Sequence, residues 1–512
     1  MNTQIRKSLN RYHMISKKDF ATSGSIRQLA WLCLAMLVTV GCSDFEASFS
    51  ISENTRSLAP EAQNGIGESP GVIALTEEKF GNPQSLKAWT KLPVNWGGTS
   101  VSVTAVGSEG DAGASGESAE VESADVPETS ESGDDRVTLQ ASDESISLPN
   151  VVSSLLVSSG ESAGQSVAVT SWDASTGEAI LATKLVLSAG DQCTLDAGKG
   201  LQEGRVLYMR HCSHCHGTAG DGNGPTAQYL NPRPRDYRHG VFKFTSTNDM
   251  SRASRNDLTR VLRYGIPGTY MPSFLLMEDD ELEAIVEYVR FLAMRGEFER
   301  KLVVELSSDY SKDAMASRIE GGETRDEIVE ELAEFLELDM PESVDYVGND
   351  LQEIWTAAET EEARVIPTVA RVPDTAESRR RGRELYLSKT LNCADCHGID
   401  GAGNGPQTMA FEKNPITNEK YNEPGLHDVW DNLNQPRNLQ AGIFRGGRRP
   451  IDIFCRVYSG IKGSRMPSFK NTPHEDIWHI VNYVLSLPFE SDPGATGSLA
   501  SSEAAGGAEA GD

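Results

Sequence analysis

The sequence has few aromatic side chains and few cysteines. Of its 512 residues, 7% are aromatic and 38% hydrophobic, which is lean for a chain of this length that folds throughout. The cysteines form two tight Cys-x-x-Cys pairs and four scattered singles, at positions 33, 42, 193, 212, 215, 393, 396 and 455. This spacing is unlike a disulfide ladder and favours attachment of a cofactor. We therefore expect folded domains separated by linkers.

Long hydrophobic runs are also missing. The apolar run LAWLCLAMLVTV at 29–40 is shorter than the roughly 20 residues that span a bilayer. It follows a basic stretch, which is typical of a secretory signal, here over residues 1–41. The junction TVGC resembles a bacterial lipoprotein processing site with Thr39 where Leu is usual, so we expect lipidation at Cys42. Ordinary cleavage nearby, with Cys42 left as a free thiol, is the alternative. Either way the protein is expected outside the cytoplasm, on the periplasmic side, and in the first case anchored to the membrane by lipid.

Basic residues are also scarce relative to acidic ones. The formal net charge is −28 at pH 7, with 47 Lys and Arg against 75 Asp and Glu. Such a surface repels nucleic acid and attracts proteins with basic docking surfaces in a salt-dependent way. Many of these acids lie in low-complexity segments, where the simpler role is solubility.

Composition divides the N-terminal half into two parts. Residues 42–135, with an especially acidic Ser/Gly/Ala stretch at 106–135, are expected to form a disordered spacer. Residues 136–195 alternate apolar and polar side chains around a turn at 173–177, which indicates a β-hairpin. This segment is either a small β module or a strand pair that packs on a partner.

The chain beyond residue 197 contains one pattern twice. GRVLYMRHCSHCHGTAGDGNGP at 204–225 matches GRELYLSKTLNCADCHGIDGAGNGP at 382–406. DLTRVLRYGIPGTYMPSF at 257–274 matches DIFCRVYSGIKGSRMPSF at 452–469 without a gap. An internal repeat of this kind predicts two copies of one domain.

The repeats set the remaining boundaries. We assign the first repeat to 198–296 and the second to 377–490. The acidic segment between them, 297–376, is patterned as amphipathic helices and predicts a helical connector. The Gly/Ala/Ser/Glu-rich tail, 491–512, is expected to be disordered.

Each repeat contains a Cys-x-x-Cys-His motif. In such a motif the two thiols form thioethers with the vinyl groups of a porphyrin, and the histidine is the proximal ligand of the haem iron. A redox dithiol or a zinc site needs only the cysteines, so the histidine that follows at once in both copies favours haem. We therefore expect two covalent c-type haems, with thioethers at Cys212, Cys215, Cys393 and Cys396 and iron ligands at His216 and His397.

The sixth iron ligand is expected from the matching MPSF loops. Met271 and Met466 lie at equivalent places in these Gly/Pro-rich loops, rather than on a helix face where methionine usually fills a core. A thioether ligand raises the reduction potential of a haem and fills the site that oxygen or peroxide would use. His239, which precedes Met271, is the best rival ligand in the first repeat.

With CHGxxGxGNGP and a distal Met-Pro in both copies, the repeats resemble the class I cytochrome c family, particularly its bacterial mono- and di-haem members. The resemblance implies a mainly α fold with two tandem domains, in each of which a helix leading into the CxxCH is crossed by a final helix. It also implies that Gly204 and Gly382 permit close crossing near Tyr288 and Tyr483.

The same resemblance suggests roles for a matching pair of arginines and raises one question. Arg235 and Arg437 either pair with haem propionates or lie solvated on the surface. The path from Pro406 to Pro436 is 21 residues longer than its counterpart in the first repeat, which leaves the surroundings of the second haem open. The singles Cys193 and Cys455 are not expected to pair.

These features favour an electron carrier rather than an enzyme. Two haems with both axial positions filled predict transfer of single electrons between redox proteins in an extracytoplasmic respiratory chain. A c-type subunit of an oxidase or dehydrogenase complex is the alternative, and a di-haem peroxidase is a weaker one because it needs a haem whose sixth site can open.

Overall fold

The computed structural model describes residues 47–107, 134–143, 145–415 and 418–489. The elements given below all lie in one compact unit that begins at Ser48. The expected signal segment, Cys42, most of the acidic stretch at 106–135 and the C-terminal tail lie outside the described residues. Within those ranges, no helix combines the length and apolar character needed to cross a bilayer.

The segment that follows Ser48 is helical, unlike the spacer expected over 42–135. It forms α2 (Glu53–Ser57), α3 (Pro60–Asn64) and α4 (Val72–Phe80), with a short antiparallel pair β1 (Gly65–Ile66) and β2 (Ser69–Pro70). Phe80 is fully buried. Its ring centroid lies 5.8 Å from that of Trp89 and 5.5 Å from that of Phe291. The apolar side chains here find a partner in the long helix α8, so burial compensates the cost of ordering this segment.

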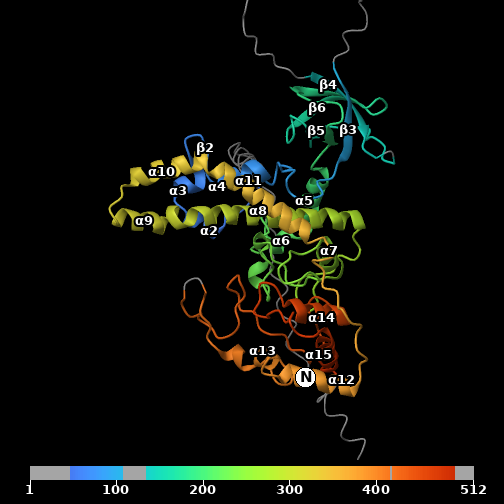
Figure 1. Ribbon diagram of the computed structural model, residues 1–512, viewed down its shortest axis with the longest axis vertical. Coiled ribbons are helices and arrows are strands. Elements are labelled where there is room, and N and C mark those ends of the chain that lie inside the picture. The colour runs from blue at the N-terminus through green and yellow to red at the C-terminus, as the bar shows by residue number, and fades with distance from the viewer. Residues whose placement is uncertain (1–46, 108–133, 144, 416–417, 490–512) are drawn as a thin grey trace, which may run out of the picture. The chain divides into compact units, whose positions relative to one another are not determined.

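The β segment is a closed barrel rather than a lone hairpin (Figure 1). Its strands are paired antiparallel in the order β3-β4-β7-β6-β5-β8. Their bounds are β3 (Thr99–Val106), β4 (Asp134–Ala141), β5 (Ser154–Val157), β6 (Ser166–Asp173), β7 (Glu178–Leu185) and β8 (Gln192–Leu195). The predicted hairpin is confirmed as β6 and β7. The barrel also takes in β3 from the expected spacer, and its closure against β8 leaves no open sheet edge.

The first repeat is built around two crossing helices. It contains α5 (Lys199–His211), α6 (Ser213–His216), the 3₁₀ turns η1 (Ala227–Tyr229) and η2 (Tyr237–His239), α7 (Arg255–Tyr264) and α8 (Asp279–Tyr310). At the crossing of α5 and α8, a Cβ on Gly204 would lie 2.0 Å from the carbonyl oxygen of Ala284 and 3.1 Å from Cβ of Tyr288. The predicted close crossing is thus confirmed.

The second repeat has the same plan. Its elements are α12 (Ala376–Leu387), α13 (Cys393–His397), η3 (Pro406–Met409), α14 (Pro450–Ser459) and α15 (His474–Ser486). A Cβ on Gly382 would lie 2.1 Å from the carbonyl oxygen of His479 and 2.8 Å from Cβ of Tyr483. The two crossings therefore agree in their contacts as well as in sequence.

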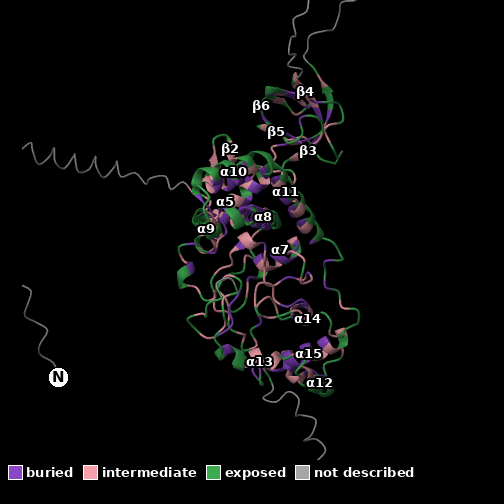
Figure 2. Cartoon of the chain, turned by 60° about the vertical axis from the view of Figure 1, so that its left-hand side comes forward, coloured by how far each residue is buried: buried purple, intermediate pink, exposed green. Residues whose placement is uncertain are grey.

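The connector is helical, as predicted, but its expected first residue lies in the middle of a helix that begins in the first repeat. Helix α8 has 32 residues and runs on past the expected boundary at 296 to Tyr310. It is followed by α9 (Lys312–Glu320), α10 (Arg325–Leu338) and α11 (Met340–Ala357). Nearly every residue from Leu282 to Glu299 on α8 is buried (Figure 2). Glu297 lies within this stretch and accepts a hydrogen bond of 2.8 Å from Nε1 of Trp355 on α11, which ties α11 to the part of α8 that directly follows the first repeat.

Candidate metal centre

The histidine of each CxxCH is oriented by a backbone carbonyl from its own repeat. Nδ1 of His216 lies 3.2 Å from the carbonyl oxygen of Arg235, and Nδ1 of His397 lies 3.3 Å from that of Arg437. When Nδ1 donates its proton to the carbonyl, Nε2 keeps a free lone pair for a metal. The two matching arginines thus contribute their backbone carbonyls to the histidine sites. The sequence alone could not indicate this backbone contribution.

Burial prepares both histidines as neutral ligands. It lowers the pKa of His216 to about 4 and also lowers the pKa of His397, because the charged imidazolium loses its hydration. At neutral pH neither ring carries a proton that an iron ion would have to displace.

A buried tyrosine fixes the turn that follows each motif. The hydroxyl of Tyr208 donates to the carbonyl oxygen of Gly217 over 2.8 Å, and that of Tyr386 donates to Gly398 over 2.7 Å. Each tyrosine lies on the helix that leads into the motif, so the position of the histidine is tied to that helix.

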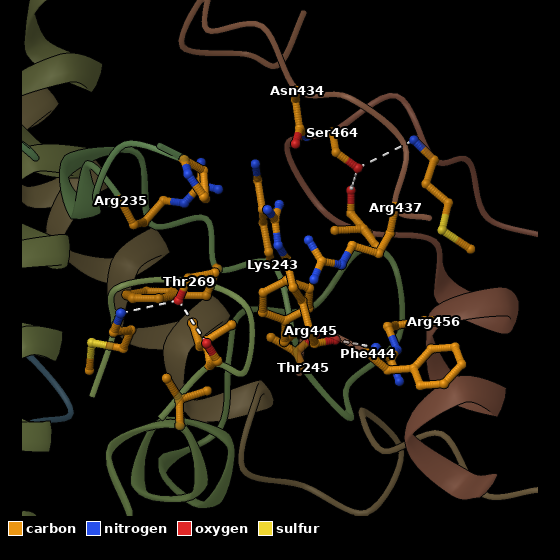
Figure 3. Close-up of a pocket in the computed structure, with 18 of the residues that line it drawn as sticks. Arg235, Lys243, Thr245, Thr269, Asn434, Arg437, Phe444, Arg445, Arg456 and Ser464 are labelled. Carbon is orange, nitrogen blue, oxygen red and sulfur yellow. Dashed lines mark hydrogen bonds between the residues drawn. The ribbon is translucent and has the colours of Figure 1, made fainter. Parts of the chain in front are cut away.

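The two methionine loops have the same internal hydrogen bonds. In the first repeat, the Thr269 hydroxyl donates to the carbonyl of Ile266 over 2.8 Å and accepts from the backbone N–H of Met271 over 3.1 Å. In the second repeat, the Ser464 hydroxyl makes the equivalent bonds to Ile461 and Met466, over 2.7 and 3.3 Å (Figure 3). Sequence reasoning missed these two hydroxyls, although the gapless alignment places both of them two residues before the methionine.

Both sites open into one continuous cavity of about 630 Å³. The residues predicted to bind the cofactor all line it, from both repeats: Cys212, Cys215, His216, Met271, Cys393, Cys396, His397 and Met466. His239, the rival ligand, does not line it and instead lies with its ring centroid 5.5 Å from that of Trp430. The structure therefore brings together the whole predicted set and leaves the rival aside.

Basic side chains gather where the two sites meet. Figure 3 shows Lys243, Arg437 and Arg445 at the centre of the cavity, with Arg235 reaching it from the first repeat. Burial lowers the pKa of Lys243 to about 8 and that of Arg235 to about 10. Nε of Arg445 is buried without a hydrogen-bond partner among the described residues. An anionic group would offset the cost of burying this charge.

The lining fits two haems. It supplies two pairs of thiols, a neutral imidazole and a thioether in each repeat, apolar walls from residues such as Leu262 and Val457, and cations to face acidic propionates. Apart from Arg235 and Arg437, sequence reasoning had not identified these cations, because Lys243, Arg445 and Arg456 lie in loops and on a helix with no motif of their own.

Comparison with known proteins agrees with this geometry. The family model described as cytochrome c matches the chain at residues 201–293 and again at 380–488. The chain contains two tandem cytochrome c domains. Two such domains bind two c-type haems covalently, and haem-based electron transfer is the activity that these domains imply.

Two other comparisons give no further information on the family or the activity. No curated protein matches the chain in sequence. A solved structure from Kuenenia stuttgartiensis, the reducing HAO-like protein complex Kustc0457/Kustc0458, is similar over 56% of this chain and 96% of the matched chain. The identity is 22% and the TM-score 0.37, too low to support any conclusion about this chain.

Proposed function

We propose that this cytochrome c carries single electrons between extracytoplasmic redox proteins and that its two haems exchange electrons directly. The proposed thioether bonds are at Cys212, Cys215, Cys393 and Cys396, and the proposed iron ligands are His216 with Met271 and His397 with Met466. The observation that carries the proposal is the single cavity lined by both sets of residues. Electron exchange is fast only over short distances, and both sites open into this one cavity.

The residues of the chain explain why a carrier is favoured over a catalyst. Each haem, when bound, supplies an iron that changes reversibly between the ferric and ferrous states. The hydroxyls of Thr269 and Ser464 hold the methionine loops, and the carbonyls of Arg235 and Arg437 hold the histidines, which favours a ligand set that stays in place when the iron changes state. A rigid set limits reorganisation on electron transfer and keeps peroxide from the sixth position.

Flash reduction tests the exchange between haems. A ruthenium photosensitiser attached near one haem delivers a single electron, and absorbance follows its redistribution to the other haem. We expect a rate that is independent of protein concentration. A rate proportional to protein concentration would mean that electrons pass only between molecules and would overturn the proposal of direct exchange.

Peroxide turnover and co-purification test the alternatives. A carrier shows no peroxide reduction above free haem and no binding of carbon monoxide to either ferrous iron. A five-coordinate haem with turnover would favour the peroxidase. Stable recovery with an oxidase or dehydrogenase from detergent-solubilised membranes would instead favour a fixed subunit of a complex.

The proposal includes a lipid anchor at Cys42 and partners with basic docking surfaces. It is supported by the TVGC junction and by the net charge of −28. Mass spectrometry of the N-terminal peptide of the mature protein is expected to show Cys42 as the first residue, carrying a diacylglyceryl group. A mature N-terminus at another residue, or an unmodified Cys42, would rule out this anchor. Electron transfer to a basic partner is expected to slow as salt is raised, because screening weakens charge steering.

A further inference from the structure

The two cytochrome c domains contact each other through their methionine loops, and the contacts are nearly reciprocal. A Cβ on Gly268, in the first loop, would lie 2.5 Å from Nη2 of Arg437 and 3.0 Å from Cγ2 of Ile443. A Cβ on Gly463, in the second loop, would lie 3.2 Å from Cγ1 of Val241, which is the counterpart of Ile443 in the first repeat. Perfect symmetry would also place Arg235, the counterpart of Arg437, against Gly463.

Trp430 occupies that place instead. The ring of Trp430 is the nearest group to Gly463, 2.5 Å from the position of an added Cβ. Arg235 lies over the face of this ring, with its guanidinium carbon 3.6 Å from the ring centroid, within the range of a cation–π contact. Trp430 belongs to the path from Pro406 to Pro436, which is 21 residues longer than its counterpart in the first repeat. A residue of the second domain therefore holds the arginine of the first site.

The backbone around Trp430 is fixed from both domains. Oδ1 of Asp428 accepts from the N–H of Trp430 over 3.1 Å, while Oδ2 forms an ion pair of 3.0 Å with Lys243 of the first domain. The N–H of Val429 donates to the carbonyl oxygen of Gly463 over 3.2 Å. Nε1 of the indole is enclosed without a hydrogen-bond partner among the described residues, so the ring is used for its face rather than for its N–H.

We propose that Trp430 is a positioning residue for the first haem, which acts by stacking on Arg235. Arg235 contributes to this site through its backbone and its side chain. Its carbonyl oxygen accepts a hydrogen bond from His216, and its guanidinium lines the cavity. Stacking keeps the positive charge beside the first site, where it stabilises the ferrous state and raises the potential. Arg437 is held differently, by a hydrogen bond of 3.2 Å from its Nε to the carbonyl oxygen of Ile443. The two haems are therefore expected to respond differently to loss of the tryptophan.

The test is a redox titration of the full-length holoprotein. It rests on the proposed binding of two haems, but it requires neither electron exchange between them nor a partner protein. The wave of the first haem is assigned with Met271→His, since an imidazole ligand lowers the potential of the haem that receives it. In Trp430→Ala, we expect the equilibrium constant for reduction of the first haem to fall about tenfold. This lowers its reduction potential by about 59 mV for one electron. Trp430→Phe keeps an aromatic face and is expected to retain most of the potential.

A double variant separates stacking from other effects. If Trp430 acts through Arg235, then Trp430→Ala causes no further shift of the first haem in an Arg235→Gln background. An equal shift in that background, a shift confined to the second haem, or no shift at all would overturn the proposal. Two haems per chain by pyridine haemochrome assay show that each variant is assembled. If Trp430→Ala does not assemble, Arg235→Lys keeps the charge without the planar group and is expected to lower the same potential.

Discussion

The two cytochrome c domains of this chain share a cofactor-binding frame and differ in what surrounds it. Both orient the histidine by an arginine carbonyl, fix the CxxCH turn by a tyrosine and brace the methionine loop by a hydroxyl. The first domain extends its final helix into the connector, whereas the second lengthens a loop that reaches into the first. The comparison teaches that ligation tolerates no change of frame, while the neighbourhood of each haem is free to diverge.

The largest expected effect comes from removing one haem at a time. Serine at Cys212 and Cys215, or at Cys393 and Cys396, is expected to halve the covalent haem, because thioethers form only at the remaining motif. Covalent haem is measured by staining after denaturing electrophoresis. The first pair is also expected to lower the thermal unfolding midpoint more, because α8 carries the connector and the N-terminal helices. Equal midpoints for the two variants would contradict this asymmetry.

The helix crossings are expected to respond alike. Gly204→Ala and Gly382→Ala each place a Cβ about 2 Å from a carbonyl oxygen, so the helices must separate. We expect each to lower the free energy of unfolding by about 3 kcal/mol. Urea titrations followed by circular dichroism measure the loss. Gly321→Ala is a matched control, because the nearest atom to its added Cβ is 3.2 Å away and its φ is −72°; a loss there equal to that at the crossings would argue against the steric cause.

Lys462 distinguishes the two methionine loops, since Pro267 stands in its place in the first. Its Nζ donates to Thr247 and to the carbonyl of Ser251 in the other domain, and burial lowers its pKa from 10.5 to about 8. Between these values the unfolded chain binds more protons than the folded one, so stability rises with pH. We expect a rise of roughly 2 kcal/mol that Lys462→Met removes. The check is the difference between the two proteins in unfolding titrations at pH 8 and 10; parallel curves would refute it.

The smallest effect is expected at the loop hydroxyls. Thr269→Ala and Ser464→Ala each remove two hydrogen bonds and are expected to cost about 1 kcal/mol of unfolding free energy. Thr269→Ser keeps the hydroxyl and serves as the control. Differential scanning calorimetry of the holoprotein measures the loss, and an equal effect of the serine variant would assign it to packing of the methyl group.

Local sequence patterns predicted the parts of this structure that depend on local chemistry. The CxxCH motifs, the methionine loops and the crossing glycines were identified from spacing, repetition and family resemblance. The structure places the motifs and the methionines on one cavity and the glycines at the two helix crossings. The β6–β7 hairpin was also found, because its strands are neighbours in sequence. Such features carry their signal within a short window.

Features that depend on distant partners escaped prediction. The helices between Glu53 and Phe80 read as spacer because they are short and gain stability only by packing on α8, far along the chain. Barrel closure needs β3 to pair with β8, and neither strand indicates the other. No local pattern marks Trp430, because its contact with Arg235 joins two domains that are far apart in sequence.

The length of α8 has a structural consequence. At 1.5 Å per residue, its 32 residues form a rod of about 48 Å that begins beside the first methionine loop and ends in the connector. Hydrogen bonds from Trp355 and Arg252 to Glu297 clamp it near the middle. One continuous helix is thus shared by the first haem pocket, where it crosses α5 at Gly204, and by the connector, where it packs against α9 and α11.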